Sequence, residues 1–220
     1  MSFVRGMVFA KKMSKWRLFR PISLTQMGSD CVVDFTLEPK AVLDGFDKIW
    51  NSTRLRELTE LAAVAVSVPK DGAVALNQKL KAAYGRNVPA AGESFIGKGN
   101  TRVMSFAKDQ FMILFDHAAH SGIPIVEKKL GNTGYYVEQT NNWVFLELSG
   151  PQARAALERV CPVNTHVDKF TVNRAERTNI EHMGTVLCRT GDDTFLIMSA
   201  SSTAGSFLHA LETSMDYVSQ

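Results

Sequence analysis

The sequence lacks any long apolar run that is free of charged residues. Its richest apolar stretch, residues 61–68, has the length of a strand, whereas a helix needs about 20 apolar residues to cross a bilayer. We therefore expect a soluble protein with no membrane partner. With 45% hydrophobic and 21% charged residues in a chain of 220, the composition predicts a globular protein with a substantial core.

Cysteine is also scarce. The three cysteines, Cys31, Cys161 and Cys188, are odd in number and far apart. They offer neither a disulfide framework nor the paired spacing of a metal site, and we expect them to fill the core. This usage favours a reducing compartment, so we predict a cytoplasmic location.

Acidic residues are absent from residues 1–29, which hold six of the 25 Lys and Arg residues. The rest of the chain has 19 Lys and Arg residues against all 22 Asp and Glu residues. We interpret 1–29 as a basic N-terminal tail outside the folded units, and a disordered terminus is the favoured interpretation. The alternative is docking on an acidic partner surface, on nucleic acid or on anionic lipid by screened attraction. A mitochondrial presequence, or a later start at Met13 or Met27, remains open.

From residue 31 onward, hydrophobic periodicity and turn residues predict an alternation of strands and helices. We expect strands at 33–37, 61–68, 101–107, 110–115, 135–140, 143–148, 178–190 and 193–199. We expect helices over 71–85, 124–131 and 151–161, and a last one that begins at Ser201 or Ser202. In the first helix, Asp71 is the expected cap, and Val74, Leu80, Ala83 and Tyr84 share a face. Residues 40–59 are expected to be a connecting segment.

The two halves of this pattern repeat. The run Asp109-Gln-Phe-Met-Ile-Leu matches Asp193-Thr-Phe-Leu-Ile-Met, at the same place in each half. We therefore predict an α+β fold of two ferredoxin-like β-α-β-β-α-β units. The first unit would cover 30–140, with an opening strand, and the second 141–220.

No motif for chemistry is complete. Asp116, His117 and His120 stand close together, but the further ligands of a closed metal shell are missing. The stretch Gly97-Lys-Gly-Asn100 lacks the spacing of a phosphate loop and is expected to be a turn. We predict no metal-binding, cofactor-binding or catalytic residues in this chain. Because the body also lacks a basic stripe with stacking aromatics, we expect no nucleic-acid partner.

One cluster of ionisable residues invites a second interpretation. Arg177, Glu181 and His182 lie close together before an apolar run. They have the residue types of an acid/base site, but no convergent pocket can be derived around them. A polar strand face or a subunit contact is the favoured interpretation.

The amino-acid sequence of the second half resembles that of a known family. The resemblance is carried by Trp143-Val-Phe-Leu-Glu-Leu-Ser-Gly-Pro-Gln-Ala-Arg, by Arg177-Thr, His182 and Val186-Leu-Cys-Arg, and by Asp193-Thr-Phe-Leu-Ile-Met-Ser-Ala-Ser-Ser-Thr-Ala-Gly-Ser-Phe-Leu. These stretches resemble the gamma subunit of heterotetrameric sarcosine oxidase. The likeness is strongest over 142–218 and extends more loosely back to about residue 30, whereas 1–28 fall outside it.

The resemblance implies a fold related to the folate-binding glycine-cleavage T-protein, and it implies an assembly. In that assembly, alpha and beta subunits hold FAD, FMN, NAD and tetrahydrofolate, and a delta subunit binds zinc. The gamma subunit carries no catalytic residues, while the complex demethylates sarcosine to glycine within one-carbon metabolism. We accordingly expect this chain to be a structural subunit with alpha, beta and delta partners. Large permanent interfaces use aromatic and arginine anchors, and our candidates are Trp16, Arg177 and Arg189.

Two alternatives remain open from the sequence. One is the equivalent subunit of a related amine dehydrogenase, such as N-methylglutamate dehydrogenase. The other is a stand-alone folate-binding protein of the aminomethyltransferase type, which needs a carboxylate and a folate pocket that the sequence does not assemble. A third class, an iron–sulfur assembly factor of the same fold, lacks its glycine-flanked cysteine motif here.

Overall fold

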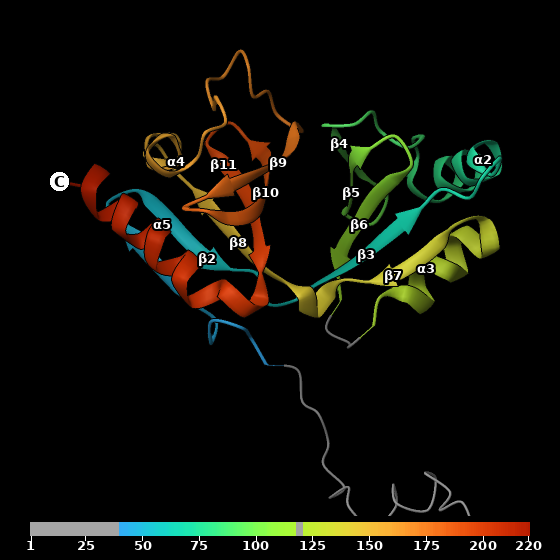
Figure 1. The fold of residues 1–220 in the computed structure, drawn as a ribbon, viewed down its shortest axis with the longest axis horizontal. Helices are drawn as coiled ribbons and strands as arrows, with labels where there is room; N and C mark the ends of the chain where they lie inside the picture. The colour runs from blue at the N-terminus through green and yellow to red at the C-terminus, as the bar shows by residue number, and fades with distance from the viewer. Residues whose placement is uncertain (1–39, 118–120) are drawn as a thin grey trace, which may run out of the picture. The chain divides into compact units, whose positions relative to one another are not determined.

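Two antiparallel sheets organise the described residues, 40–117 and 121–220, of this computed structural model (Figure 1). The five-stranded sheet has the order β4-β5-β6-β3-β7 and the six-stranded sheet the order β1-β2-β8-β11-β10-β9. The strands are β1 (Asp47–Trp50), β2 (Thr53–Glu57), β3 (Leu61–Ser67), β4 (Ser94–Gly97), β5 (Thr101–Ala107), β6 (Gln110–Asp116), β7 (Tyr135–Glu138), β8 (Trp143–Ser149), β9 (Ala175–Ile180), β10 (Met183–Gly191) and β11 (Thr194–Ala200).

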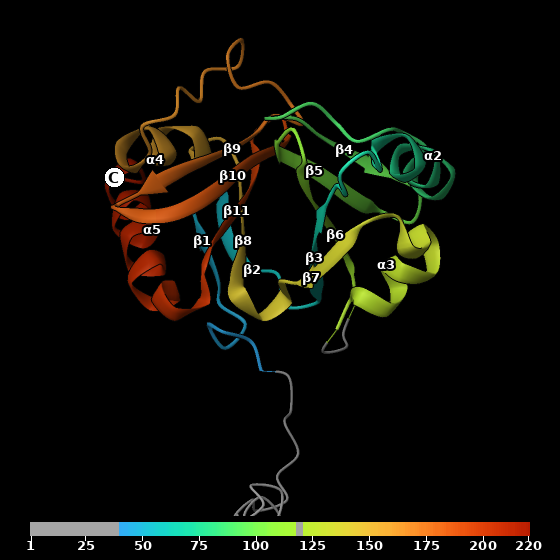
Figure 2. The same ribbon diagram turned by 45° about the vertical axis from the view of Figure 1, so that its right-hand side comes forward.

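Each sheet is covered on its outer face by two helices (Figure 2). Helices α2 (Ala73–Tyr84) and α3 (Ile123–Leu130) pack on the five-stranded sheet, and α4 (Ala153–Val160) and α5 (Ala204–Val218) pack on the six-stranded sheet. Three short 3-10 helices, η1 (Gly131–Thr133), η2 (Thr140–Asn142) and η3 (Ser201–Thr203), complete the elements. No helix within the described ranges is long and apolar enough to cross a membrane.

The inner faces of the two sheets pack on each other through a third apolar cluster. Ala63, Met104, Met112 and Leu114 of the five-stranded sheet meet Phe145, Val186, Cys188, Leu196 and Met198 of the six-stranded sheet. Because strand side chains alternate between faces, β3, β6, β8 and β11 each supply both this inner layer and an outer, helix-covered layer. This explains why the central strands are apolar almost throughout.

The two sheets are built by one repeated plan. β3 and β8 open the two repeats and have the same alternation of buried and half-buried residues. In the first repeat, α3 is followed by β7, which pairs with β3. In the second, the chain ends with α5, and β2 from the N-terminal side takes the corresponding place beside β8. The predicted α+β fold of two ferredoxin-like units is confirmed, and the structure adds that β2 supplies the strand that completes the second unit.

Several predicted elements are confirmed within a few residues. β3, the β5–β6 hairpin around Lys108-Asp109, α3 and β8 lie where the patterns place them. α2 ends at Gly85, whose φ of 95° is the left-handed conformation that glycine supplies at helix ends. The opening strand at 33–37 and the basic tail at 1–29 lie outside the described residues.

The expectation of a connecting segment at 40–59 is wrong, because 47–57 forms the β1–β2 hairpin. Its strands are short and charged, and Leu55 is its only side chain that is both apolar and fully enclosed. Leu55 is buried in the apolar cluster of the second half, beside its ladder partner Leu148 of β8. The division of the chain into 30–140 and 141–220 stays a prediction, and this hairpin hydrogen-bonds into the sheet of the second half.

Two further local predictions are wrong. The strand expected over 178–190 turns at Glu181-His182, where both residues have positive φ, so that β9 and β10 form a hairpin. Asp71 does not cap α2, because its own φ is 62° and Gly72 occupies the N-cap without a side-chain bond. Val74 is 70% exposed, and Leu76 takes its place on the buried face.

Gly150 allows the β1–β2 hairpin to approach the turn that precedes α4. Its φ is 126°, and a Cβ atom there would lie 2.6 Å from Thr53 Cα and against the Ser52 carbonyl oxygen. Backbone atoms cannot move aside as a flexible side chain can. We therefore expect Gly150→Ala to lower the free energy of unfolding by about 3 kcal/mol, from strain and overpacking together.

Gly205 is the matched control in a urea titration. It lies in α5, and a Cβ atom there meets nothing within 4 Å. Gly205→Ala should therefore raise stability by up to about 1 kcal/mol, the difference in helix propensity. Equal unfolding midpoints for the two variants would contradict the close approach at Gly150.

Candidate functional site: the cleft between the two sheets

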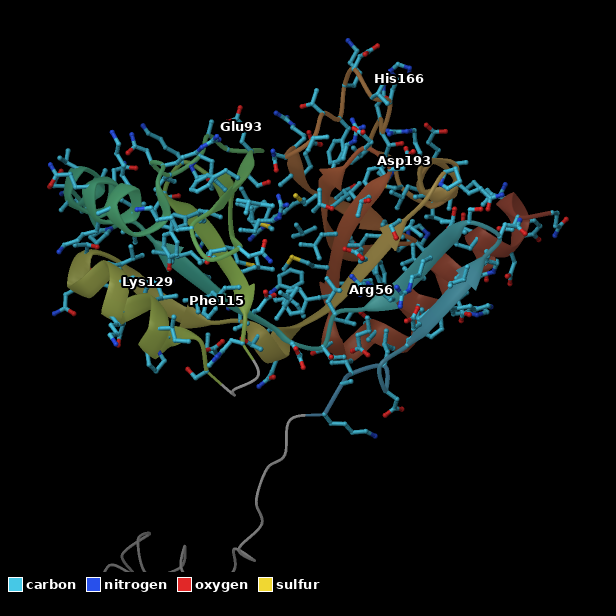
Figure 3. All side chains as sticks on the ribbon, turned by 180° about the vertical axis from the view of Figure 1, so that it is seen from behind. Arg56, Glu93, Phe115, Lys129, His166 and Asp193 are labelled. Carbon is cyan, nitrogen blue, oxygen red and sulfur yellow. The ribbon has the colours of Figure 1, made fainter. Side chains whose placement is uncertain are left out.

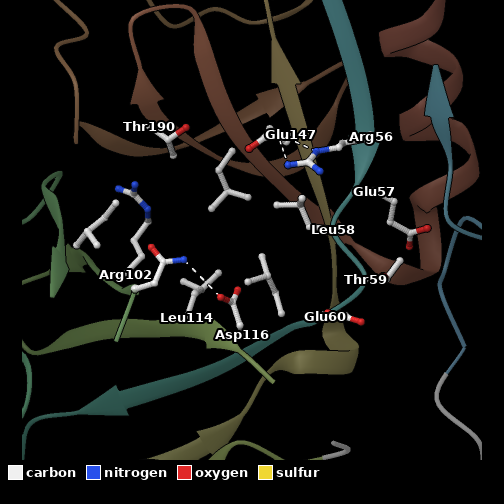
Figure 4. Close-up of a pocket in the computed structure, with 14 residues that line it drawn as sticks. Arg56, Glu57, Leu58, Thr59, Glu60, Arg102, Leu114, Asp116, Glu147 and Thr190 are labelled. Carbon is white, nitrogen blue, oxygen red and sulfur yellow. Dashed lines mark hydrogen bonds and ion pairs between the residues drawn. The ribbon is translucent and has the colours of Figure 1, made fainter. Parts of the chain in front are cut away.

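A cavity of about 420 Å³ opens where the inner apolar layer between the sheets ends (Figure 4). Its volume is in the range of small-molecule sites. Its lining combines apolar and charged side chains from both sheets: Arg56, Glu57, Leu58, Thr59, Glu60, Leu61, Ile96, Asn100, Arg102, Leu114, Asp116, Glu147, Thr190 and Leu196. A larger hollow of about 670 Å³ shares Glu57–Leu61 but is walled by residues next to segments that the structure does not describe.

Strand register explains how charged residues reach this cleft. Arg102 lies opposite Leu114 in the β5–β6 ladder, and both side chains face the other sheet. Arg56 lies opposite Glu147 in the β2–β8 ladder, and the two form an ion pair of 2.8 Å. The β2–β8 pairing therefore builds one wall of the cavity, and the β5–β6 hairpin builds the other.

Arg102 is the centre of a polar junction between the sheets. It is 8% exposed, and its Nη1 donates to Ser94 Oγ at 3.0 Å and to Asn173 Oδ1 at 3.1 Å. Ser94 donates its backbone N–H and its hydroxyl to the Asn173 carbonyl oxygen at 2.7 and 2.9 Å. Beside this junction, an isolated antiparallel β-bridge between the backbones of Glu93 and Arg174 connects the two sheets. Figure 3 labels Glu93.

Cys188 lies under Arg102, with 3.7 Å between its Sγ and Arg102 Nη1. Burial raises the pKa of the Cys188 thiol, although Arg102 and the Ser94 hydroxyl act in the opposite direction. Burial likewise raises the pKa of Cys161, which is 6% exposed at the end of α4. The predicted core-filling role is confirmed for these two cysteines, and Cys31 lies outside the described residues.

Two carboxylates of the cavity lining, besides that of Glu147, accept hydrogen bonds from the described part of the chain. Glu57 accepts from the backbone N–H groups of Leu43 at 3.1 Å and Gly45 at 2.9 Å. Asp116 accepts from the Asn100 amide at 3.4 Å. Across residues 40–117 and 121–220, no group of three metal-ligating side chains comes together.

The structure describes two of the three predicted interface residues. Arg177 is exposed on β9, with its guanidinium 5.0 Å from the centre of the Phe106 ring. Arg189 is only 5% exposed, and it donates within the chain to the carbonyl oxygens of Phe170 at 3.0 Å and Asp192 at 2.7 Å. Trp16 lies outside the described residues. An interface role for these residues stays a prediction, and only Arg177 presents its side chain at the surface of this chain.

The other residues that the sequence offered as site candidates do not come together in one site of the described structure. Glu181 and His182 form the exposed turn of the β9–β10 hairpin, and no hydrogen bond or ion pair joins them to Arg177 in the described structure. Gly97–Asn100 makes the turn between β4 and β5, as predicted. His117 follows β6 next to Asp116, whereas His120 is not described. Arg102 was not predicted as a functional residue from the sequence. The one sequence feature that could have indicated it is a charged residue at an inward-facing position of the otherwise apolar β5–β6 hairpin.

The fold class is that of a glycine-cleavage aminomethyltransferase. The solved structure of aminomethyltransferase T from Bartonella henselae matches 79% of this chain and 46% of its own, with a TM-score of 0.55 and 18% identity. At this identity the likeness concerns the fold alone. The predicted T-protein-like fold is confirmed.

Sequence similarity identifies the family. The sarcosine oxidase gamma subunit of an Arthrobacter species is 30% identical over 146 residues, covering 66% of this chain and 70% of that protein. The gamma subunit of Corynebacterium sp. strain P-1 is 28% identical over 166 residues, covering 74% of this chain and 80% of its own. No family model matches the sequence. The chain belongs to the family of sarcosine oxidase gamma subunits.

A solved assembly supports this membership. Heterotetrameric sarcosine oxidase from Corynebacterium sp. U-96, in complex with pyrrole 2-carboxylate, contains a chain that matches 79% of this one. The match covers 88% of that chain, with a TM-score of 0.67 and 27% identity. The likeness therefore extends over both sheets rather than over a single repeat.

Thiol labelling tests the burial of the two described cysteines. In a Cys31→Ser background, we expect Cys161 and Cys188 to react with iodoacetamide at pH 8 about tenfold or more slowly than in denaturant. Burial blocks access, and the raised pKa of each thiol lowers its thiolate fraction. Equal rates in buffer and in denaturant would contradict the packing described here.

Proposed function

We propose that this chain is the gamma subunit of a heterotetrameric sarcosine oxidase and that its role there is structural. The observation that carries the proposal is the 27% identity and 88% coverage of a chain of a heterotetrameric sarcosine oxidase. The named relatives at 28–30% identity support the same assignment. Their name favours it over a related amine dehydrogenase subunit and over a stand-alone aminomethyltransferase.

The partners follow from the assembly. We propose that alpha, beta and delta subunits complete the complex, and that FAD, FMN, NAD, tetrahydrofolate and zinc are held by those partners. The chemistry would then be the oxidative demethylation of sarcosine to glycine in the cytoplasm, with this chain stabilising the complex. A gamma subunit of this kind needs a permanent interface, commonly about 2,000 Å² or more of buried surface.

Co-expression tests the assignment directly. A tagged form of this chain, co-expressed with the flavoprotein and zinc subunits, should elute with them from a size-exclusion column. The complex should produce hydrogen peroxide from sarcosine, whereas the purified chain alone should be colourless and inactive. Full assembly and activity of the partners without this chain, together with its separate elution, would overturn the proposal.

Arg177 provides a point test of the interface. We expect Arg177→Glu to weaken association with the partners by about tenfold or more, as loss of an arginine anchor does. Arg86→Glu is the matched control, because Arg86 is also exposed and its guanidinium lies 5.8 Å from the centre of the Phe95 ring. The dissociation constants can be compared by titrating labelled variants onto the other subunits. Equal effects of the two substitutions would remove Arg177 from the interface.

A further inference from the structure

The described part of the chain has two buried arginines, and their surroundings differ. Arg189 donates to four backbone carbonyl oxygens and has the carboxylate of Asp192 at 4.0 Å. Arg102 has no carboxylate oxygen within 4.0 Å in residues 40–117 and 121–220, and its close oxygen acceptors, Ser94 Oγ and Asn173 Oδ1, are neutral. Arg102 is therefore a buried cation that this part of the chain does not neutralise.

Such a charge is costly to bury and cannot be removed by deprotonation. An unpaired ion in a protein interior loses much of its favourable hydration free energy, and an arginine side chain stays protonated at any ordinary pH. Cys188 does not supply the missing negative charge, because burial raises the pKa of its thiol and favours the neutral form. The counter-charge is then expected from outside residues 40–117 and 121–220.

The remaining N–H groups of Arg102 face accessible space. Its hydrogen bonds within the described structure all come from Nη1. Among described side chains, the one fully enclosed polar atom without a partner is Tyr84 Oη, so Nε and Nη2 of Arg102 are not fully enclosed. Because Arg102 lines the 420 Å³ cavity, that cavity is the space available to them (Figure 4).

We infer that the cleft between the two sheets is a binding site for a small organic monocarboxylate, whose carboxylate pairs with Arg102. A guanidinium with free N–H groups matches a carboxylate in geometry and charge. The ligand's body would lie against Leu58, Leu61, Ile96, Leu114 and Leu196. The site belongs to this chain alone and does not depend on the proposed role in an oxidase.

The other charges in the cleft limit the ligand to a single negative charge. Arg56 is already paired with Glu147 at 2.8 Å. Glu60 and Asp116 place further negative charge around the rest of the cavity. A second carboxylate on the ligand would face these groups and be repelled, so a monocarboxylate should bind more tightly than a dicarboxylate of the same shape.

Calorimetric titration of the full 220-residue chain with benzoate tests the site, with benzamide as the neutral probe of the same shape. We expect benzoate to bind and to raise the melting temperature, and benzamide and phthalate to bind more weakly. Arg102→Met should weaken benzoate binding by about tenfold or more, since it removes charge-assisted hydrogen bonds. Arg86→Met, which changes an exposed arginine outside the cavity, should bind benzoate like the unmodified chain.

Urea unfolding of Arg102→Met separates binding from folding. Because the substitution removes an unneutralised buried charge, the variant should unfold at a urea concentration no lower than that of the unmodified chain without ligand. Arg102→Lys should retain part of the benzoate affinity and serves as the second variant if Arg102→Met does not fold. Absence of benzoate binding, equal affinity for benzamide, tighter binding of phthalate, or unchanged affinity in Arg102→Met would each overturn the inference.

Discussion

The apolar layer between the two sheets is the interaction on which the rest of the structure depends. Each sheet has helices on its outer face, so its inner face must be covered by the other sheet or remain in water. Met104, Met112, Phe145 and Met198 are among the large side chains of this layer. Burial of such side chains contributes roughly 1.5–3 kcal/mol each. The layer also decides where the cleft lies, because the cavity opens where these side chains end.

The repeat shows how one plan can leave two halves unequal. In the five-stranded sheet, β7 follows α3 and supplies the strand beside β3. In the six-stranded sheet the same position is filled by β2, which is paired on its other edge with β1. Because β2 takes this position, Arg56 lies opposite Glu147, and the cleft has a charged wall. β7 has Val137 at the corresponding position and provides no such charge.

A shared fold does not by itself define a shared activity. The aminomethyltransferase likeness concerns backbone architecture at 18% identity, whereas the gamma relatives share sequence over most of their length. In this chain the polar junction of Arg102, Ser94 and Asn173 connects the sheets and also borders the cavity. The same residues therefore join the two sheets and define the chemistry of the space beside them.

Local sequence patterns determined the elements whose signal lies within a few residues. The β5–β6 hairpin follows from two apolar runs around Lys108-Asp109, and the end of α2 follows from Gly85. The α+β class and the repeat followed from the order of such elements, and the family followed from the amino-acid sequence of 142–218.

Tertiary structure decided the features that depend on residues far apart in the sequence. The hairpin of 47–57 has little apolar content and becomes a strand pair only beside β8, while Arg102 reads in sequence as one charge in a strand. Its burial, its neutral neighbours and the cavity beside it arise only when the second sheet covers the first, because a pattern of single residues carries no information about which distant surface will meet them.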